Sequence, residues 1–451
     1  MIHKFHLKDL YIVLDVCSGA VHVVDELCYN LLDFCEEEME AQCPSAALAT
    51  LEAPPEDIRE AYGELFTLYE NGQLFSKDDY EQFSGRFGPS PVKAMCLHIA
   101  HDCNLRCDYC FAAKGDFGHG RKLMPLEVGI AAMDYLVANS GARKNLEVDF
   151  FGGEPLMNFD VVKKIVAYAR GLEKKHDKRF RFTVTTNGLL LDPDIRDYIN
   201  REMDNVVLSI DGRRSVNDRL RVTPNGKGSY DAIVPKYKEL VSHRKEKSYY
   251  VRGTFTKYNL DFTQDVLHLY DLGFDQISVE PVVSDPKLNY SIGEGDLPAI
   301  FQEYERLADV LVEKKSAGEK INFFHYMLDL DGGPCAIKRL RGCSAGNEYV
   351  AVTPEGDIYP CHQFVGIDGW KMGNILDGTL DMKMKKMFAA TNVLSKEECR
   401  SCWARFFCSG GCNANNLQYA GDIQKPHKLS CELEKKRLEC AIYVKAKLAE
   451  E

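Results

Sequence analysis

Three cysteines in one short stretch have a spacing that could ligate iron. Cys103, Cys107 and Cys110 follow an apolar, strand-like run at residues 92–100 and are spaced CxxxCxxC. Three thiolates on one loop can hold three corners of a four-iron cluster, whereas four thiolates normally fix such a cluster. The fourth iron would then be open to a substrate or cofactor. The alternative is a zinc site, with a histidine just before Cys103 as the fourth ligand.

A second group of cysteines lies near the C-terminal end of the sequence. Four of them follow the pattern C-x2-C-x5-C-x3-C, a fifth comes 19 residues later, and two more lie upstream in the order C-x12-G-x4-C. These are Cys399, Cys402, Cys408, Cys412, Cys431, Cys343 and Cys361. The regular spacing indicates metal ligation, and a double zinc module is the alternative to iron–sulfur clusters.

Composition narrows the functional classes. The 451 residues suggest about three domains, and the net charge of −12 argues against a nucleic-acid partner. No apolar run approaches the ~20 residues of a membrane-spanning helix, and the first residues do not resemble a signal peptide. Seventeen cysteines without an export signal therefore indicate metal ligation in a reducing cytoplasm. Oxygen-sensitive clusters would further imply an anaerobic organism.

The elements that must position the first three cysteines alternate between strand and helix. Strands are predicted at residues 94–100, 146–151, 180–185, 205–210, 249–256 and 275–281. Helices are predicted at 125–138, 158–172, 192–202, 229–244, 261–272 and 297–314. Six strand–helix pairs predict an α/β fold, a partial (β/α)6 TIM barrel over residues 92–320, with its chemistry at the C-terminal ends of the strands.

Residues 1–80 predict a small winged-helix-like domain. Two β-rich runs, 5–16 and 20–24, predict a hairpin that turns at Gly19. Amphipathic patterns predict a helix at 25–38 and a second helix after Pro54-Pro55 that ends at Asn71-Gly72, and 73–75 could form a short wing strand. The second helix is acidic, which disfavours DNA binding. A linker at 81–91 and a cysteine-rich domain at 321–451 complete the predicted organisation.

The predicted strand ends carry further candidate residues. Gly152-Gly153-Glu154 closes the second strand, where glycines allow close backbone approach and a carboxylate can accept hydrogen bonds from an ammonium group. Together with CxxxCxxC, this order of motifs resembles the radical S-adenosylmethionine (SAM) superfamily. The resemblance implies that Cys103, Cys107 and Cys110 bind a [4Fe-4S] cluster whose open iron chelates SAM. It also implies SAM contacts from Tyr109, Gly152, Gly153, Glu154, Thr186, Asn187, Ser209, Asp211 and Arg221.

The C-terminal cysteine pattern resembles the SPASM domains of radical SAM peptide-modifying enzymes. The resemblance implies two auxiliary [4Fe-4S] clusters, and thus three clusters in all. An outer auxiliary cluster would be held by Cys399, Cys402, Cys408 and Cys431, and an inner one by Cys343, Cys361 and Cys412. The fourth position of the inner cluster is either filled by Cys335 or open to a substrate cysteine.

The order of the three domains resembles the thioether-forming (sactionine-type) peptide maturases, and among them the clostridial maturases of "six cysteines in forty-five residues" peptides. This implies a Cys-rich precursor peptide whose leader adds a strand to the N-terminal domain, and a flavodoxin- or ferredoxin-type electron donor. A 5′-deoxyadenosyl radical would remove hydrogen from a carbon, to which a cysteine sulfur then couples. Three alternatives stay open: a sulfatase-maturase-like oxidase of cysteine or serine, which would need a catalytic base, a non-catalytic cluster protein, and a zinc regulator.

Overall fold

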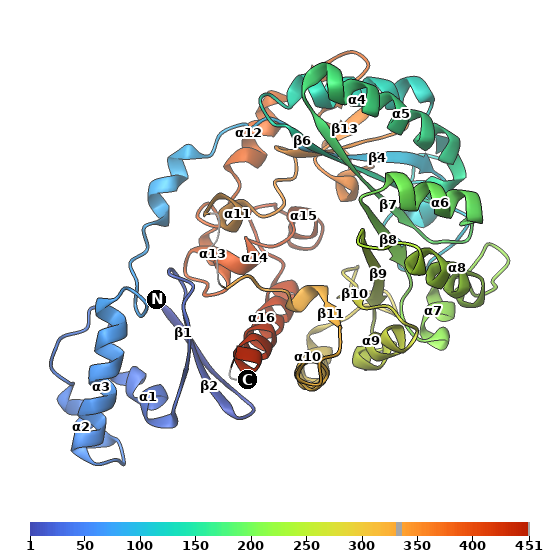
Figure 1. The fold of residues 1–451 in the computed structure, drawn as a ribbon. Helices are drawn as coiled ribbons and strands as arrows, with labels where there is room; N and C mark the ends of the chain where they lie inside the picture. The colour runs from blue at the N-terminus through green and yellow to red at the C-terminus, as the bar shows by residue number, and fades with distance from the viewer. Residues whose placement is uncertain (331–335, 450–451) are drawn as a thin grey trace.

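The computed structural model describes residues 1–330 and 336–449, without the side chains of 84–86 and 336–338. A curved, mostly parallel sheet with helices on its outer face occupies one side of the molecule, and a small antiparallel sheet with its own helices lies on the other (Figure 1). Within the described part, no helix is both long and apolar enough to cross a membrane.

The six predicted barrel strands are confirmed. They are β4 (Ala94–His101), β6 (Asn145–Gly152), β7 (Arg179–Thr186), β8 (Asn205–Ser209), β9 (Ser248–Phe255) and β10 (Gln276–Pro281). Each pairs in parallel with the next, in the order β4-β6-β7-β8-β9-β10. Every second residue of β6, such as Val148 and Phe150, is fully buried under the helices. Because side chains alternate along a strand, the intervening residues face the interior of the half-barrel.

The helices on the outer face of the sheet also match the prediction. They are α4 (Leu126–Asn139), α5 (Phe159–His176), α6 (Pro193–Glu202), α8 (Tyr230–Ser242), α9 (Phe262–Asp271) and α10 (Leu297–Ser316). Asp192 caps the start of α6 by accepting a hydrogen bond from the Ile195 amide. One short helix, α7 (Arg214–Leu220), was not predicted.

The sheet is open, and strands from outside the predicted barrel extend it at both edges. β11 (Asn322–Phe323) pairs with β10, and β12 (Tyr349–Val352) pairs in parallel with β4. β12 then continues antiparallel through β13 (Asp357–Tyr359), β14 (Gly373–Asn374) and β15 (Thr379–Leu380), while β5 (Lys122–Leu123) pairs with β4. The sheet therefore contains strands from both sides of the predicted domain boundary at 320/321. The position of that boundary stays a prediction.

The N-terminal sheet corrects one predicted strand. Residues 5–16 are not one strand, because β1 (Ile2–Leu7) and β2 (Leu10–Asp15) form a hairpin that turns at Lys8, whose φ is 57°. The predicted turn at Gly19 is confirmed: its φ is 81°, and it leads into β3 (Val21–Val24), which pairs with β2. The order is β1-β2-β3, so β3 is an edge strand.

The N-terminal helices are α1 (Glu26–Leu31), the 3₁₀ helix η1 (Leu32–Phe34), α2 (Ser45–Thr50) and α3 (Pro55–Glu70). The predicted helix at 25–38 was too long, since helical structure ends at Phe34. α3 ends at Glu70 with Asn71 as its C-cap, as predicted. The wing strand at 73–75 was wrong: these residues form no strand, and the Gln73 carbonyl instead hydrogen-bonds the His22 ring at 2.9 Å. The predicted linker is partly ordered as η2 (Tyr80–Arg86).

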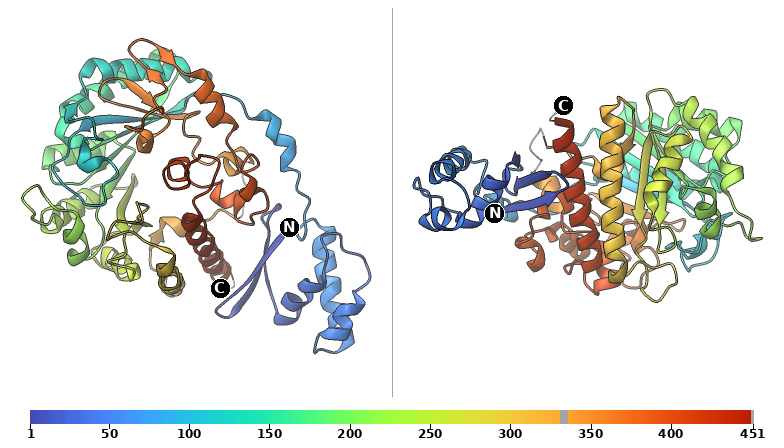
Figure 2. Two further views of the ribbon diagram at one scale, coloured as in Figure 1. Left: turned by 180° about the vertical axis from the view of Figure 1, so that it is seen from behind. Right: turned by 90° about the horizontal axis from the view of Figure 1, so that it is seen from below.

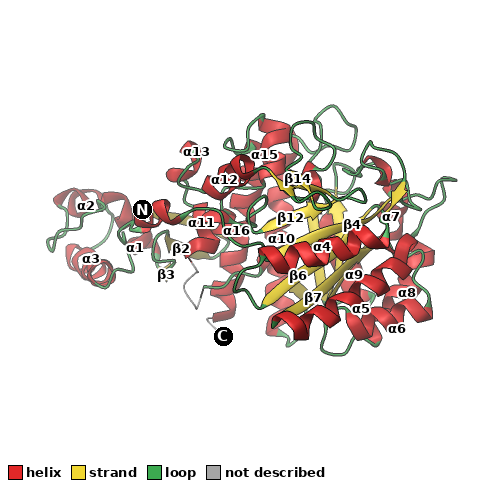
Figure 3. Cartoon of the chain, turned by 90° about the horizontal axis from the view of Figure 1, so that it is seen from above, coloured by secondary structure: helices red, strands yellow, loops and turns green. Residues whose placement is uncertain are grey.

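The C-terminal part joins the two halves of the molecule. Its helices are α11 (Ala336–Arg341), α12 (Met382–Ala390), α13 (Glu397–Arg400), α14 (Arg405–Cys408), α15 (Asn413–Ala420) and α16 (Lys428–Ala449). α16 lies along α10 and also contacts β1, so it is sandwiched between barrel and N-terminal domain (Figures 2 and 3). The remaining 3₁₀ turns are η3 (Ala113–Gly115), η4 (Pro155–Asn158), η5 (Glu294–Asp296), η6 (Phe324–Tyr326) and η7 (His362–Phe364).

Candidate active site and auxiliary cluster sites

The three-cysteine loop leaves the C-terminal end of β4 and is held by the glycine turn after β6. The Gly153 amide donates to Ala100 O at 2.7 Å, and the Glu154 amide donates to Asp102 O at 2.8 Å. A Cβ on Gly153 would lie 2.1 Å from Asp102 O, and one on Gly115 would lie 2.5 Å from the Cys103 Cβ. Both glycines are therefore required by the close approach of backbone to the cysteine loop.

A cavity of about 270 Å³ at the C-terminal strand ends brings together the predicted residues. Its lining includes the three loop cysteines and eight of the nine predicted SAM contacts: Tyr109, Gly152, Gly153, Thr186, Asn187, Ser209, Asp211 and Arg221. These residues come from the loop after β4, the ends of the three successive strands β6, β7 and β8, and the segment after α7. Their convergence follows from the parallel sheet, which places all carboxyl ends of the strands at one edge.

Tyr109, Asp211 and Arg221 form a buried polar cluster in this cavity. The Tyr109 hydroxyl donates to the Asp211 carboxylate at 2.8 Å, and Arg221 Nη1 donates to the Tyr109 oxygen at 2.8 Å. Burial raises the pKa of Asp211 to about 6. The Nε of Arg221 is buried and has no hydrogen-bond partner among the described residues. An unpaired buried guanidinium donor fits an anionic group such as the SAM carboxylate.

Glu154 lies beneath this cavity rather than in its lining. The side chain is fully buried, and its carboxylate accepts from Thr186 Oγ1 and the Asn187 amide, both at 2.8 Å. Burial raises its pKa to about 7. Asn187 in turn donates to Asn104 Oδ1 at 2.8 Å and approaches the Cys103 sulfur at 3.5 Å. Glu154 thus orients the residues around the cluster loop, and its direct contact with SAM stays a prediction.

Four charged or amide residues in the cavity lining were missed by the sequence analysis. Arg252 of β9 and Glu280 of β10 form an ion pair at 2.7 Å, and both are charged residues near the C-terminal ends of predicted strands, a signal that could have identified them. Gln363 and Asn415 come from the C-terminal part. No sequence signal places these two beside the barrel, because that depends on the pairing of β12 with β4.

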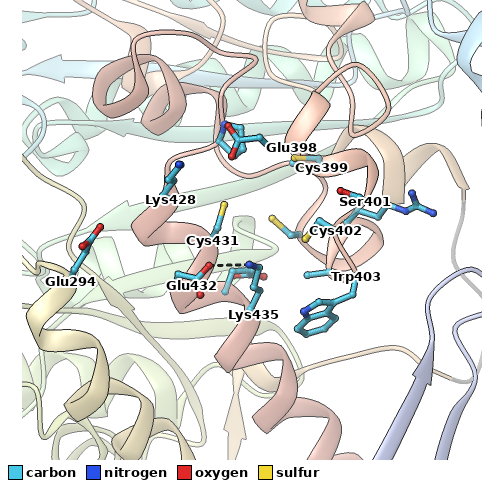
Figure 4. A pocket seen from close by; sticks show the side chains of 16 residues that line it. Glu294, Glu398, Cys399, Ser401, Cys402, Trp403, Lys428, Cys431, Glu432 and Lys435 are labelled. Atoms are coloured by element: carbon cyan, nitrogen blue, oxygen red, sulfur yellow. Dashed lines mark hydrogen bonds and ion pairs between the residues drawn. The ribbon is translucent and has the colours of Figure 1, made fainter. Parts of the chain in front are cut away.

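The outer set of predicted ligands is also gathered in one place. Cys399, Cys402, Cys408 and Cys431 line a second cavity of about 550 Å³, and Figure 4 shows the sulfurs of Cys402 and Cys431 pointing into the same space. Burial raises the pKa of Cys431 to about 11 and that of Cys408 to about 12.

The inner set is partly exposed. Cys361 is buried, and Cys412 and Cys343 are both close enough to act on it electrostatically. Cys335, the candidate fourth ligand, lies outside the described residues. Across residues 1–330 and 336–449, no three His, Cys, Asp or Glu side chains converge closely enough to ligate a single metal ion.

Comparison with known proteins agrees with this geometry. The model of the radical SAM superfamily matches residues 97–266, and that of the SPASM iron–sulfur cluster-binding domain matches residues 343–403. A cysteine-type anaerobic sulfatase-maturating enzyme of Clostridium novyi is 25% identical over 348 residues, which cover 72% of this chain and 89% of that protein. The radical SAM cyclopropyl synthase TigE of Paramaledivibacter caminithermalis is 22% identical and covers 76% of this chain and 72% of its own length.

Solved structures show the same fold. The AdoMet-bound sulfatase-maturating enzyme anSMEcpe superposes with a TM-score of 0.64 at 20% identity, over 78% of this chain and 97% of that one. Streptococcus suis SuiB, bound to its precursor peptide SuiA, superposes with a TM-score of 0.55 at 18% identity, over 94% and 97% of the two chains. The chain thus contains a radical SAM domain and a SPASM iron–sulfur cluster-binding domain, and it is related to anaerobic sulfatase-maturating enzymes and to TigE.

Proposed function

We propose that this enzyme forms thioether crosslinks between cysteine sulfurs and acceptor carbons of a Cys-rich, ribosomally made peptide. One observation carries the proposal. The cavity lined by Cys103, Cys107, Cys110 and Arg221 continues to Gln363 and Asn415, which lie two residues after Cys361 and three after Cys412. A peptide in this cavity would touch both the SAM site and the inner auxiliary site.

The residues of the chain position the reactants. SAM and the clusters, when bound, supply a 5′-deoxyadenosyl radical that removes hydrogen from carbon, and an acceptor for the surplus electron. Arg221 and the Tyr109–Asp211 pair hold the polar end of SAM. Cys343, Cys361 and Cys412 would hold the inner cluster, and an open iron there would bind the substrate sulfur as a thiolate. Each crosslink thus forms one C–S bond and removes two hydrogens, one from carbon and one from sulfur.

The N-terminal domain serves as the leader-binding element in this proposal. β3 is an edge strand, and its Val23 side chain is exposed, so an extended peptide could add a fourth strand there. The domain is anchored to the cluster-bearing segment: the His3 ring stacks on Trp403 with centroids 3.7 Å apart, and buried Arg405 pairs with Asp78 at 2.6 Å. A leader bound at β3 would therefore hold the adjoining core peptide at a fixed distance from the barrel.

The test is co-expression of the enzyme with the cysteine-rich peptide encoded beside it, under anaerobic conditions. The expected product has lost two hydrogens per crosslink, and the linked cysteines resist alkylation. A Cys107→Ala variant serves as the control and leaves the peptide unmodified. A reductant of the flavodoxin or ferredoxin type should support turnover, and SAM cleavage without any peptide crosslink would refute the proposal.

A second candidate is oxidation of a cysteine or serine to formylglycine. It is favoured by the similarity to sulfatase-maturating enzymes and by Glu280, a carboxylate that lines the cavity and could act as a base. Burial raises the pKa of Glu280, but the charges of Arg252 and Arg437 outweigh this effect and keep the pKa below its usual value, so Glu280 is ionised. Formylglycine as the product, with no crosslink, would favour this candidate over thioether formation.

A further inference from the structure

A buried lysine lies between the two groups of SPASM cysteines. Lys396 is 1% exposed, and its ammonium group donates to Gly410 O at 2.7 Å and to Asn413 Oδ1 at 3.0 Å. Both acceptors are neutral. Among the residues that the structure describes, no carboxylate forms an ion pair with it. A buried cation without an anion is costly, and buried charges in proteins are normally paired.

The position of Lys396 connects both ligand sets. Its carbonyl accepts a hydrogen bond from the Cys399 amide at 3.0 Å, at the start of the segment that bears the outer ligands. Its ammonium reaches Gly410, between Cys408 and Cys412, one cysteine of each set. The thiols that act on it electrostatically are Cys399 and Cys408 of the outer set and Cys412 and Cys343 of the inner set.

When these four cysteines are deprotonated, their thiolates supply the negative charge that balances the ammonium group of Lys396. Lys396 is 1% exposed, and an ammonium group buried this deeply requires nearby anions to balance its charge. A four-iron cluster held by thiolates is such an anion, and hydrogen bonds and net charge around a cluster set its reduction potential. We propose that Lys396 is the shared counter-charge of the two auxiliary clusters, a positioning residue that stabilises their reduced, more negative states.

The consequence concerns how easily the two clusters are reduced. A fixed cation close to both clusters favours uptake of an electron by either one. The competing explanation is that Lys396 only ties two loops together through its hydrogen bonds. The two explanations differ in whether charge or hydrogen bonding matters at this position.

The chain offers a matched control. Lys385 of α12 is 8% exposed, and within the described part of the chain the charge that acts on it is Glu348, a carboxylate rather than a thiol. Lys385→Met therefore removes a buried lysine of the same region without touching either cysteine set. Lys396→Gln keeps a hydrogen-bond donor without the charge, Lys396→Met removes both, and Lys396→Arg keeps the charge.

The experiment is an anaerobic redox titration of the full-length protein, followed by electron paramagnetic resonance. A Cys103→Ala/Cys107→Ala/Cys110→Ala background leaves only the auxiliary clusters to be observed. We expect Lys396→Met and Lys396→Gln to disfavour reduction about tenfold, equal to a fall of about 59 mV for one electron, and Lys385→Met to leave the potential unchanged. Unchanged potentials in both neutral Lys396 variants at full iron content would overturn the proposal.

If the neutral variants lose iron, Lys396→Arg shows whether the lost charge or the changed packing is the cause. If Lys396→Arg retains the iron and the potential that Lys396→Gln loses, the positive charge is what the clusters require, in support of the proposal. If Lys396→Arg also loses its iron, Lys396 acts through packing, and the proposal is wrong. The inference rests on clusters in the SPASM domain and not on thioether chemistry, so the two proposals fail independently.

Discussion

Replacing Gly153 by alanine should remove the SAM-binding cluster and leave the fold intact. The added Cβ would lie 2.1 Å from Asp102 O, and real Cβ contacts below 3.0 Å essentially never occur, so these atoms must separate by at least 0.9 Å (3.0 − 2.1). Asp102 directly precedes Cys103, and the neighbouring atom on the other side is the Gly115 carbonyl oxygen at 2.9 Å. Only backbone can yield, so the cysteine loop is pushed from its position.

The magnitude follows from overpacking, which costs about 1–3 kcal/mol in a well-packed site. That is too little to unfold a large domain whose strands and helices are otherwise unchanged. Gly171 is the matched control: it lies in α5, a Cβ there meets nothing within 4 Å, and alanine should stabilise the helix by about 0.5–1 kcal/mol. The two Gly→Ala variants therefore have opposite expected effects.

The assay is iron and sulfide counting on anaerobically reconstituted protein, together with circular dichroism and SAM cleavage. Gly153→Ala should retain the native spectrum, lose about four of about twelve irons, the content of one cluster, and lose SAM cleavage. Gly171→Ala should match the wild-type protein in all three. Full iron content and normal SAM cleavage in Gly153→Ala would refute the argument that the glycine is required by the approach of the loop.

Three further predictions follow from single contacts. Arg221→Gln should weaken SAM binding about 10- to 150-fold, because a hydrogen bond to a charged group contributes about 1.5–3 kcal/mol. The iron content should stay unchanged. Calorimetric titration measures the affinity for SAM, and an affinity equal to that of the wild type would exclude the Arg221–SAM contact. The backbone N–H groups of His22 and Val23 point to opposite edges of β3, so only one of them can pair with an added strand. His22→Pro and Val23→Pro each remove one N–H, and leader binding should be abolished in the variant that loses the outward-facing group. Fluorescence anisotropy with a labelled leader measures this, and full binding in both variants would exclude strand addition at β3. His325 is buried beside Arg437, and its pKa is lowered to about 3. Because the unfolded chain takes up this proton near pH 6.5 and the folded protein does not, wild-type stability should fall by about 2 kcal/mol between pH 7 and pH 5 through this group. His325→Gln should show a smaller acid-induced drop in its urea midpoint, and equal drops would contradict the prediction.

Local patterns were sufficient to predict the barrel but not the N-terminal hairpin. Strands β6, β7, β8 and β9 have buried residues at alternate positions and lie between amphipathic helices, so pattern and fold agree. In residues 5–16, by contrast, apolar side chains flank Lys8 and Asp9 on both sides and hide the turn. The turn there depends on Lys8 in a left-handed conformation without glycine or asparagine, which the sequence does not signal.

Contacts between segments far apart in the chain also could not be predicted from the sequence. Motif order identified the residues that line the SAM cavity, since strand ends in a parallel sheet must meet. It did not reveal that β12 would join β4, which brings Gln363 and Asn415 to the same cavity. Nor did it distinguish Glu154, buried beneath the cavity, from residues in its lining, because burial of a single carboxylate depends on the packing of its neighbours.

The most direct test of the central claim is SAM cleavage by anaerobically prepared protein under a strong reductant. If the loop of Cys103, Cys107 and Cys110 holds a four-iron cluster with one open iron, SAM will be split into methionine and 5′-deoxyadenosine, and Cys107→Ala will not split it. Intact SAM in a wild-type sample that contains its full complement of iron and sulfide would contradict the account.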